Sequence, residues 1–126
     1  MSESLKNARH GLLRLHKTLL DWERGRYERT HGRKSNAELL NAFLQDPQFA
    51  WLRPMSQLIV RIDEMLEEKE PPSRAEIDTM LEQIKALTSI DQADDEYAGR
   101  YRDALQEASD AVLAHRDLVA LLQAGR

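Results

Sequence analysis

Residues 3–31 read ESLKNARHGLLRLHKTLLDWERGRYERTH and carry the longest periodic apolar pattern of the 126-residue chain. Apolar side chains recur there three and four residues apart, which is the spacing of one face of an α-helix. The repeating positions are Leu5, Ala8, Leu12, Leu15, Leu19 and Trp22. The pattern predicts one helix over residues 3–31 with a buried face, and Gly32 is suited to end it.

A polar row lies inside that apolar face. Arg9, His16 and Glu23 follow one another at intervals of seven residues, with leucines on both sides of the row. A polar group in such a position costs free energy unless a partner satisfies it. Arg9 is close to the helix start and can extend to water. We therefore expect His16 and Glu23 to point inward and to have partners.

Helical periods continue through the rest of the sequence, and no strand pattern interrupts them. Ser35 with Glu38, and Ser73 with Glu76, match the capping box that opens a helix. The first pair predicts a short helix, and the second predicts a helix that extends to about residue 89. Both segments present apolar residues on one face, as helices packed in a bundle do.

Two further helices are expected around proline and aspartate positions. Residues 47–69 keep one helical phase across Pro54, which predicts a single helix kinked at that residue. Asp91 can cap the last helix, whose small inward alanines imply close approach to a neighbouring helix. The inward row of that helix is Tyr97, Tyr101, Ala104, Ala108, Ala111, His115, Leu118 and Leu122.

These segments predict the fold class and the domain organisation. Residues 1–126 are expected to form one all-α domain, an antiparallel up-and-down four-helix bundle with one extra short helix. Apolar residues make up 41% of the chain, enough for a core, and the absence of cysteine excludes disulfides and thiolate metal sites. No run approaches the roughly 18 apolar residues of a membrane span, and the polar start lacks a signal core. We therefore expect a cytoplasmic protein without membrane contact.

The charge is unevenly distributed along the chain. Residues 1–61 hold 11 Lys and Arg against 6 Asp and Glu, a balance of +5, whereas residues 62–126 hold 7 against 16, a balance of −9. The favoured interpretation is that the two halves face each other across the bundle and pair at its rims. The alternative is that two oppositely charged surfaces attract partners or a second copy.

One constellation of polar residues is a candidate site in the bundle core. His115 occupies an inward position of the last helix, so it can meet His16 or Glu23 if the first and last helices are neighbours. A carboxylate beside an imidazole fixes its tautomer and favours its charged form. Two interpretations remain open, a structural polar contact or a site in which His16, Glu23 and His115 bind a metal or a small ligand.

Metal motifs are otherwise few. Glu28 and His31 form one Glu-x-x-His element, whereas di-iron bundles use two such elements and two further glutamates. We therefore expect no cofactor, and a metal ion in the core site is the alternative.

A basic segment follows the middle of the first helix. It consists of Arg24, Arg26, Arg29, Arg33 and Lys34. Basic residues at a helix C-terminus interact favourably with the helix dipole, and the same residues could bind an anion or nucleic acid. The sequence pI of about 5.6 disfavours nucleic acid as the partner.

Phe49 and Trp51 lie between two prolines and predict a rigid aromatic corner. This corner either closes the end of the bundle or anchors a protein partner. The surrounding segments, DPQFAWLRP at residues 46–54 and LIVRIDE at residues 58–64, resemble a pattern of small uncharacterised bacterial proteins, as does LLRLHKTLL at residues 12–20. The resemblance implies a bacterial cytoplasmic protein and assigns no activity or catalytic residue.

The sequence contains no nucleophile motif and no glycine-rich phosphate loop. The leading hypothesis is therefore a non-enzymatic helical-bundle protein that acts through protein contacts, as a homo-oligomer or an accessory subunit. The alternatives are ligand binding in the core and anion binding through the basic segment.

Overall fold

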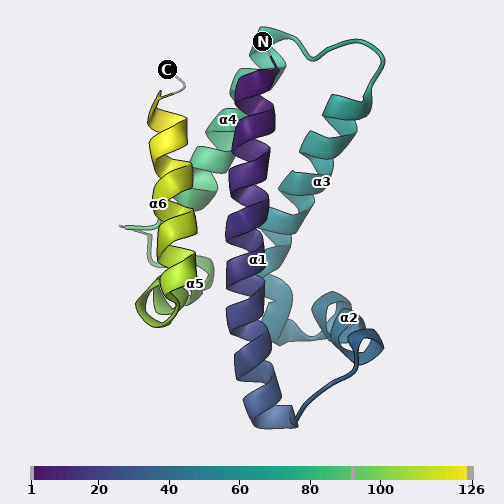
Figure 1. Ribbon diagram of the computed structural model, residues 1–126, viewed down its shortest axis with the longest axis vertical. Coiled ribbons are helices and arrows are strands. Elements are labelled where there is room, and N and C mark those ends of the chain that lie inside the picture. Colours follow the sequence, from purple (N-terminus) through teal and green to yellow (C-terminus); the bar gives the residue numbers. More distant parts are fainter. Residues whose placement is uncertain (1, 92, 125–126) are drawn as a thin grey trace.

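The computed structural model describes residues 2–91 and 93–124, and the described residues form helices joined by short connections, without a strand (Figure 1). The prediction of an all-α chain is confirmed. The elements are α1 (Glu3–His31), α2 (Asn36–Gln45), the 3-10 helix η1 (Pro47–Leu52), α3 (Arg53–Glu67), α4 (Arg74–Thr88), α5 (Glu96–Glu107) and α6 (Ser109–Ala124).

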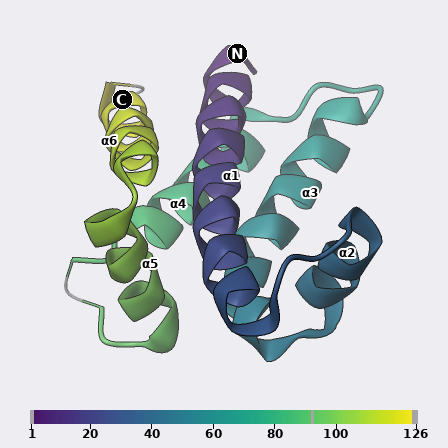
Figure 2. The same cartoon turned by 60° about the horizontal axis from the view of Figure 1, so that its bottom comes forward.

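The long helix α1 lies at the centre of the molecule, with α6 on one side and α3 on the other (Figures 1 and 2). It contacts η1, α3, α4, α5 and α6. Leu5, Leu12, Leu15 and Leu19 are completely buried, as the three-four spacing predicts. The buried face of α1 therefore packs against the other elements and forms the centre of the core.

The first and last helices are neighbours, and their contact is the most extensive between any two elements of the described residues. Small residues permit the close approach. A Cβ added at Gly11 would lie 2.9 Å from Cδ1 of Leu118, and Ala111 and Ala114 of α6 are buried. The inference that small side chains mark a close helix contact is confirmed.

The helix starts follow local capping chemistry. Ser35 and Ser73 each accept a hydrogen bond from the backbone of the glutamate three residues later, and that glutamate bonds back to the serine backbone. Both predicted capping boxes are confirmed. The predicted cap at Asp91 is wrong, because Asp95 performs this role, with its carboxylate 2.9 Å from the backbone nitrogen of Ala98.

The predicted last helix is divided in two. Ala108 leaves the helical region at φ −121° and ψ 108°, so α5 ends there and α6 begins at Ser109. Tyr101 and Ala104 before the break, and Ala111 and Leu118 after it, are all buried. The apolar period continues across the break, which is why periodicity alone predicted one helix.

The segment around Pro54 also differs from the single kinked helix that was predicted. Residues Pro47–Leu52 form a 3-10 helix, and Pro54 lies in the first turn of α3. A proline is tolerated there because its missing N–H has no partner in the helix. Arg53 keeps helical angles, φ −60° and ψ −41°, so the helical phase is preserved without a loop.

The predicted arrangement as an antiparallel up-and-down four-helix bundle stays a prediction. Contacts link α1 with α3, α3 with α4, α4 with α6, and α6 with α1. The described residues form six α-helices and one 3-10 helix, whereas the sequence predicted four longer helices and one short one.

Candidate ligand-binding site

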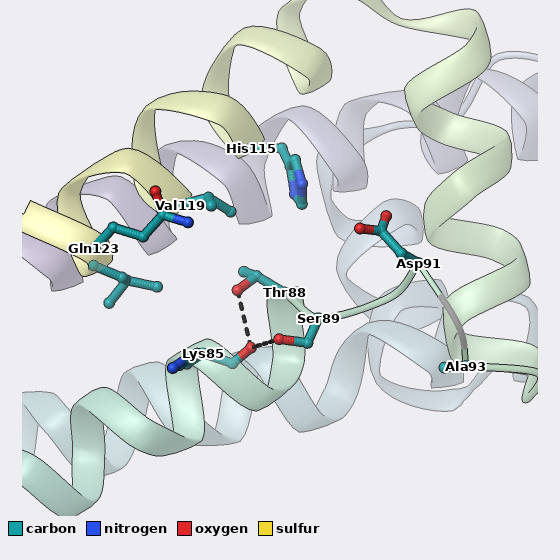
Figure 3. Close-up of a pocket in the computed structure, with 9 residues that line it drawn as sticks. Lys85, Thr88, Ser89, Asp91, Ala93, His115, Val119 and Gln123 are labelled. Carbon is teal, nitrogen blue, oxygen red and sulfur yellow. Dashed lines mark hydrogen bonds between the residues drawn. The ribbon is translucent and has the colours of Figure 1, made fainter.

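A cleft of about 690 Å³ opens between the C-terminal end of α4, the connection to α5, and α6 (Figure 3). Its polar walls are formed by Lys85, Thr88, Ser89, Asp91, His115 and Gln123. Ala93, Val119 and Leu122 provide apolar surface. Clefts of roughly 300–1,000 Å³ that combine apolar surface with a few convergent polar groups are the usual form of small-ligand sites.

His115 projects from α6 into this cleft (Figure 3). Its Nδ1 lies 2.6 Å from the hydroxyl of Tyr101, and the two rings meet edge to face with centroids 5.3 Å apart. Tyr101 is completely buried, and this burial raises the pKa of its hydroxyl well above its usual range. The neutral, buried Tyr101 hydroxyl therefore holds the His115 imidazole in one orientation through its bond to Nδ1.

The ionisation of His115 is set mainly by its burial. Burial lowers the pKa of the imidazole below the ordinary value of 6.5, while the nearby Asp91 carboxylate opposes this change. The ring is therefore neutral at pH 7. A neutral imidazole offers one N–H donor and one acceptor nitrogen.

The end of α4 forms the opposite wall, and its hydroxyl groups satisfy the helix carbonyls. The hydroxyls of Thr88 and Ser89 donate to the carbonyl oxygen of Lys85 at 3.1 and 2.7 Å, as the dashed lines in Figure 3 show. The Thr88 hydroxyl also lies 3.2 Å from the carbonyl of Ile84. The bonds to Lys85 satisfy one of the last four carbonyls of α4, which a helix end leaves without a partner inside the helix.

The predicted core constellation does not assemble. His16 and Glu23 have hydrogen-bond partners on other elements, and His115 bonds to Tyr101. The Nε2 of His16 lies 2.6 Å from Oγ of Ser56 in α3, and burial lowers the pKa of this imidazole. The first and last helices are neighbours, which was the condition for this contact, but His16 and Glu23 of α1 face α3, η1 and α5 rather than His115.

Glu23 is the buried polar residue that the sequence pointed to, with no exposed surface. Its Oε1 accepts hydrogen bonds from Nε1 of Trp51 at 2.8 Å and from Nη1 of Arg100 at 3.3 Å. Its Oε2 accepts from Nε2 of Gln48 at 3.0 Å and lies 3.7 Å from Nη1 of Arg26. One carboxylate thereby joins α1, η1 and α5, which is a structural role.

Phe49 and Trp51 form part of the core and have little surface to offer a partner. They are 2% and 5% exposed, and their rings pack against Tyr27, Phe43 and Trp22. Of the two interpretations of this corner, the burial of both rings favours closure of the end of the bundle over contact with a protein partner. Their rings are buried where η1 packs against the C-terminal half of α1, so they close that end of the core.

The basic segment does not gather into one surface of unpaired cations. Arg24 pairs with Glu28, and Arg26 approaches Glu23 while its guanidinium lies 4.8 Å from the Trp22 ring centre. The backbone nitrogen of Lys34 donates to the Glu28 carboxylate. Exposed side chains remain at Arg29 and Arg33.

Two features of the described residues concern metal binding and membrane crossing. Among residues 2–91 and 93–124, no group of three or more His, Cys, Asp or Glu side chains is placed to hold a metal ion. No helix in this part of the chain is long and apolar enough to cross a membrane. Comparisons of the whole chain with protein-family models, curated proteins and solved structures give no match.

The sequence did not predict the cleft, and of the predicted site residues only His115 lines it. His115 was singled out because it interrupts an apolar row. The other walls come from the end of α4 and the connection after it, where Thr88, Ser89 and Asp91 follow one another closely in the sequence. Such a polar run after a helix is typical of any connecting segment, so it carried no specific signal.

Proposed function

We propose that this chain is a non-enzymatic protein that binds a small ligand in the cleft between α4 and α6. The observation that carries the proposal is the oriented His115 imidazole, which a buried tyrosine holds in a cleft of about 690 Å³. In this proposal α1, α3, α4 and α6 act as an antiparallel four-helix bundle that supports the cleft. The proposed ligand site is thus the cleft beside His115 rather than the predicted core site of His16, Glu23 and His115.

Physical chemistry favours binding at this place for two reasons. A side chain that is already held in position loses little conformational entropy when a ligand binds. Tyr101 is locked by packing and by its hydrogen bond, so it can hold the His115 ring for this purpose. The apolar surface of Val119 and Leu122 adds the hydrophobic contribution that small-ligand sites generally contain.

The test is an NMR titration of the four histidine side chains with a panel of amino acids, hydroxy acids, nucleosides and sugars. We expect at least one compound to shift the His115 resonances and to leave the exposed His10 unchanged. The variant His115→Phe keeps a ring of similar size and should abolish that binding, whereas His10→Phe should not. If no compound perturbs His115, the proposed function is wrong.

Self-association is a second candidate function, and the outer face of α2 favours it. Leu40 and Leu44 are one turn apart and are 59% and 63% exposed, whereas Leu39 and Ala42 of the same helix are buried. The only formal charge of α2 is Glu38, which is tied into the capping box. Two copies of this face can meet around a two-fold axis without bringing like charges together.

We expect the double variant Leu40→Ser with Leu44→Ser to be monomeric and the unmodified protein to be a dimer. Light scattering after size-exclusion chromatography measures both masses. Val60→Ser is the matched control, because Val60 is 52% exposed but lies on α3. A monomeric unmodified protein at high concentration would exclude this candidate and leave the ligand proposal unaffected.

A further inference from the structure

The cleft beside His115 carries opposite charges from two elements. Lys85 comes from the last turn of α4, and Asp91 comes from the connection that follows. In Figure 3 the Asp91 carboxylate lies on one side of the His115 ring, and Lys85 lies across the cleft. The salt bridges within residues 2–91 and 93–124 join other residues. Both charges are thus available to a ligand.

The hydrogen bond between Tyr101 and His115 determines which imidazole nitrogen carries the proton. A buried hydroxyl that does not donate loses a hydrogen bond, which is costly. In the part of the chain that the structure describes, the group hydrogen-bonded to the Tyr101 hydroxyl is Nδ1 of His115, 2.6 Å away. Nδ1 therefore accepts, and the proton of the neutral ring resides on Nε2. The ring offers the cleft an N–H donor, which selects a ligand group that accepts hydrogen bonds.

We propose that the ligand is a small zwitterion of the amino-acid or short-peptide class with an aliphatic side chain. This inference rests on the proposed function. The ligand carboxylate accepts from Nε2–H of His115 and pairs with Lys85, and the ligand ammonium pairs with Asp91. The aliphatic side chain packs against Val119 and Leu122, which line the same cleft. Charge-assisted hydrogen bonds of this kind are stronger than neutral ones.

Four probes separate the groups that the proposal requires. L-leucine carries both charges, N-acetyl-L-leucine lacks the ammonium, L-leucinamide lacks the carboxylate, and L-leucyl-L-leucine places both charges on a longer molecule. Isothermal titration calorimetry with the full chain measures their affinities. We expect each single-charge probe to bind about tenfold or more weakly than the better zwitterion, because one charged contact is lost. The leucine and dileucine results distinguish an amino acid from a peptide.

Two conservative variants give a crossed pattern. Asp91→Asn should weaken the binding of the zwitterion about tenfold. It should leave the binding of N-acetyl-L-leucine unchanged, since that probe has no ammonium. Lys85→Met should weaken the binding of the zwitterion and of N-acetyl-L-leucine. It should leave the binding of L-leucinamide unchanged, since that probe has no carboxylate. Asp91 and Lys85 are not part of the buried core, so neither change removes a core contact.

The outcomes distinguish this inference from the proposed function. Equal affinity for N-acetyl-L-leucine and for the better of the two zwitterions, L-leucine or L-leucyl-L-leucine, would overturn the ammonium contact and therefore the zwitterion. The zwitterion is also overturned if none of the four probes binds while a hydroxy acid, nucleoside or sugar of the NMR panel shifts His115, and the proposed function then stands. If neither the probes nor the panel binds, both proposals fail.

Discussion

Replacing Glu23 by alanine is expected to lower the free energy of unfolding by about 3–5 kcal/mol, the range found when one partner of a buried ion pair is removed. Glu23 is fully buried and bonds to Trp51, Gln48 and Arg100. The alanine variant leaves the buried indole N–H of Trp51 without its acceptor. It also leaves the Arg100 guanidinium, 30% exposed, without its carboxylate.

Urea unfolding at pH 7 measures this effect, and Glu23→Gln refines it. Glutamine keeps the shape and an oxygen that can accept from Trp51, but its amide N–H groups face the donors Gln48 and Arg26. We therefore expect the free energy of unfolding of the Glu23→Gln variant to lie between that of the unmodified protein and that of the Glu23→Ala variant. The matched control is Asp21→Ala, which breaks an exposed pair with Lys17. It should cost less than about 1 kcal/mol, and a similar loss in both alanine variants would contradict the role of Glu23.

The inward position of Glu23 could be predicted because it depends on α1 alone. Positions seven residues apart share a face of a helix, and the leucines on both sides show that this face is buried. Capping boxes could be predicted for the same reason, since Ser35 and Glu38 act within one turn. The spacing of nearby residues thus predicts which face of a helix is buried and where a helix begins.

The partners of Glu23 and His115 could not be predicted, because they depend on how distant elements are rotated. Arg100 is separated from Glu23 by 77 residues, and nothing in the α5 sequence distinguishes it from an exposed arginine. The break at Ala108 adds to the difficulty. Tyr101 and His115 bond across it, 14 residues apart and on different helices. A continuous last helix would have placed these two residues almost four turns apart, beyond contact.

The close contact of α1 and α6 leads to the second large effect. Leu118 is 1% exposed, and its Cδ1 would lie 2.9 Å from a Cβ at Gly11. We expect Leu118→Ala to lower the free energy of unfolding by about 2–5 kcal/mol, since it removes buried methyl groups and leaves a cavity against α1. Urea unfolding measures this loss. Leu113→Ala is the control on the same helix, because Leu113 is 39% exposed.

A double-mutant cycle with Gly11→Ala tests whether the contact is as close as described. An alanine is favoured over glycine inside a helix by about 1 kcal/mol, and Gly25→Ala should show this gain because a Cβ there meets nothing within 4 Å. In the unmodified protein the gain at Gly11 is opposed by the Leu118 side chain. In the Leu118→Ala background the obstruction is gone, so Gly11→Ala should stabilise by an amount close to that of Gly25→Ala. Equal effects of Gly11→Ala in the two backgrounds would show that the side chains at positions 11 and 118 do not meet, since coupling requires contact.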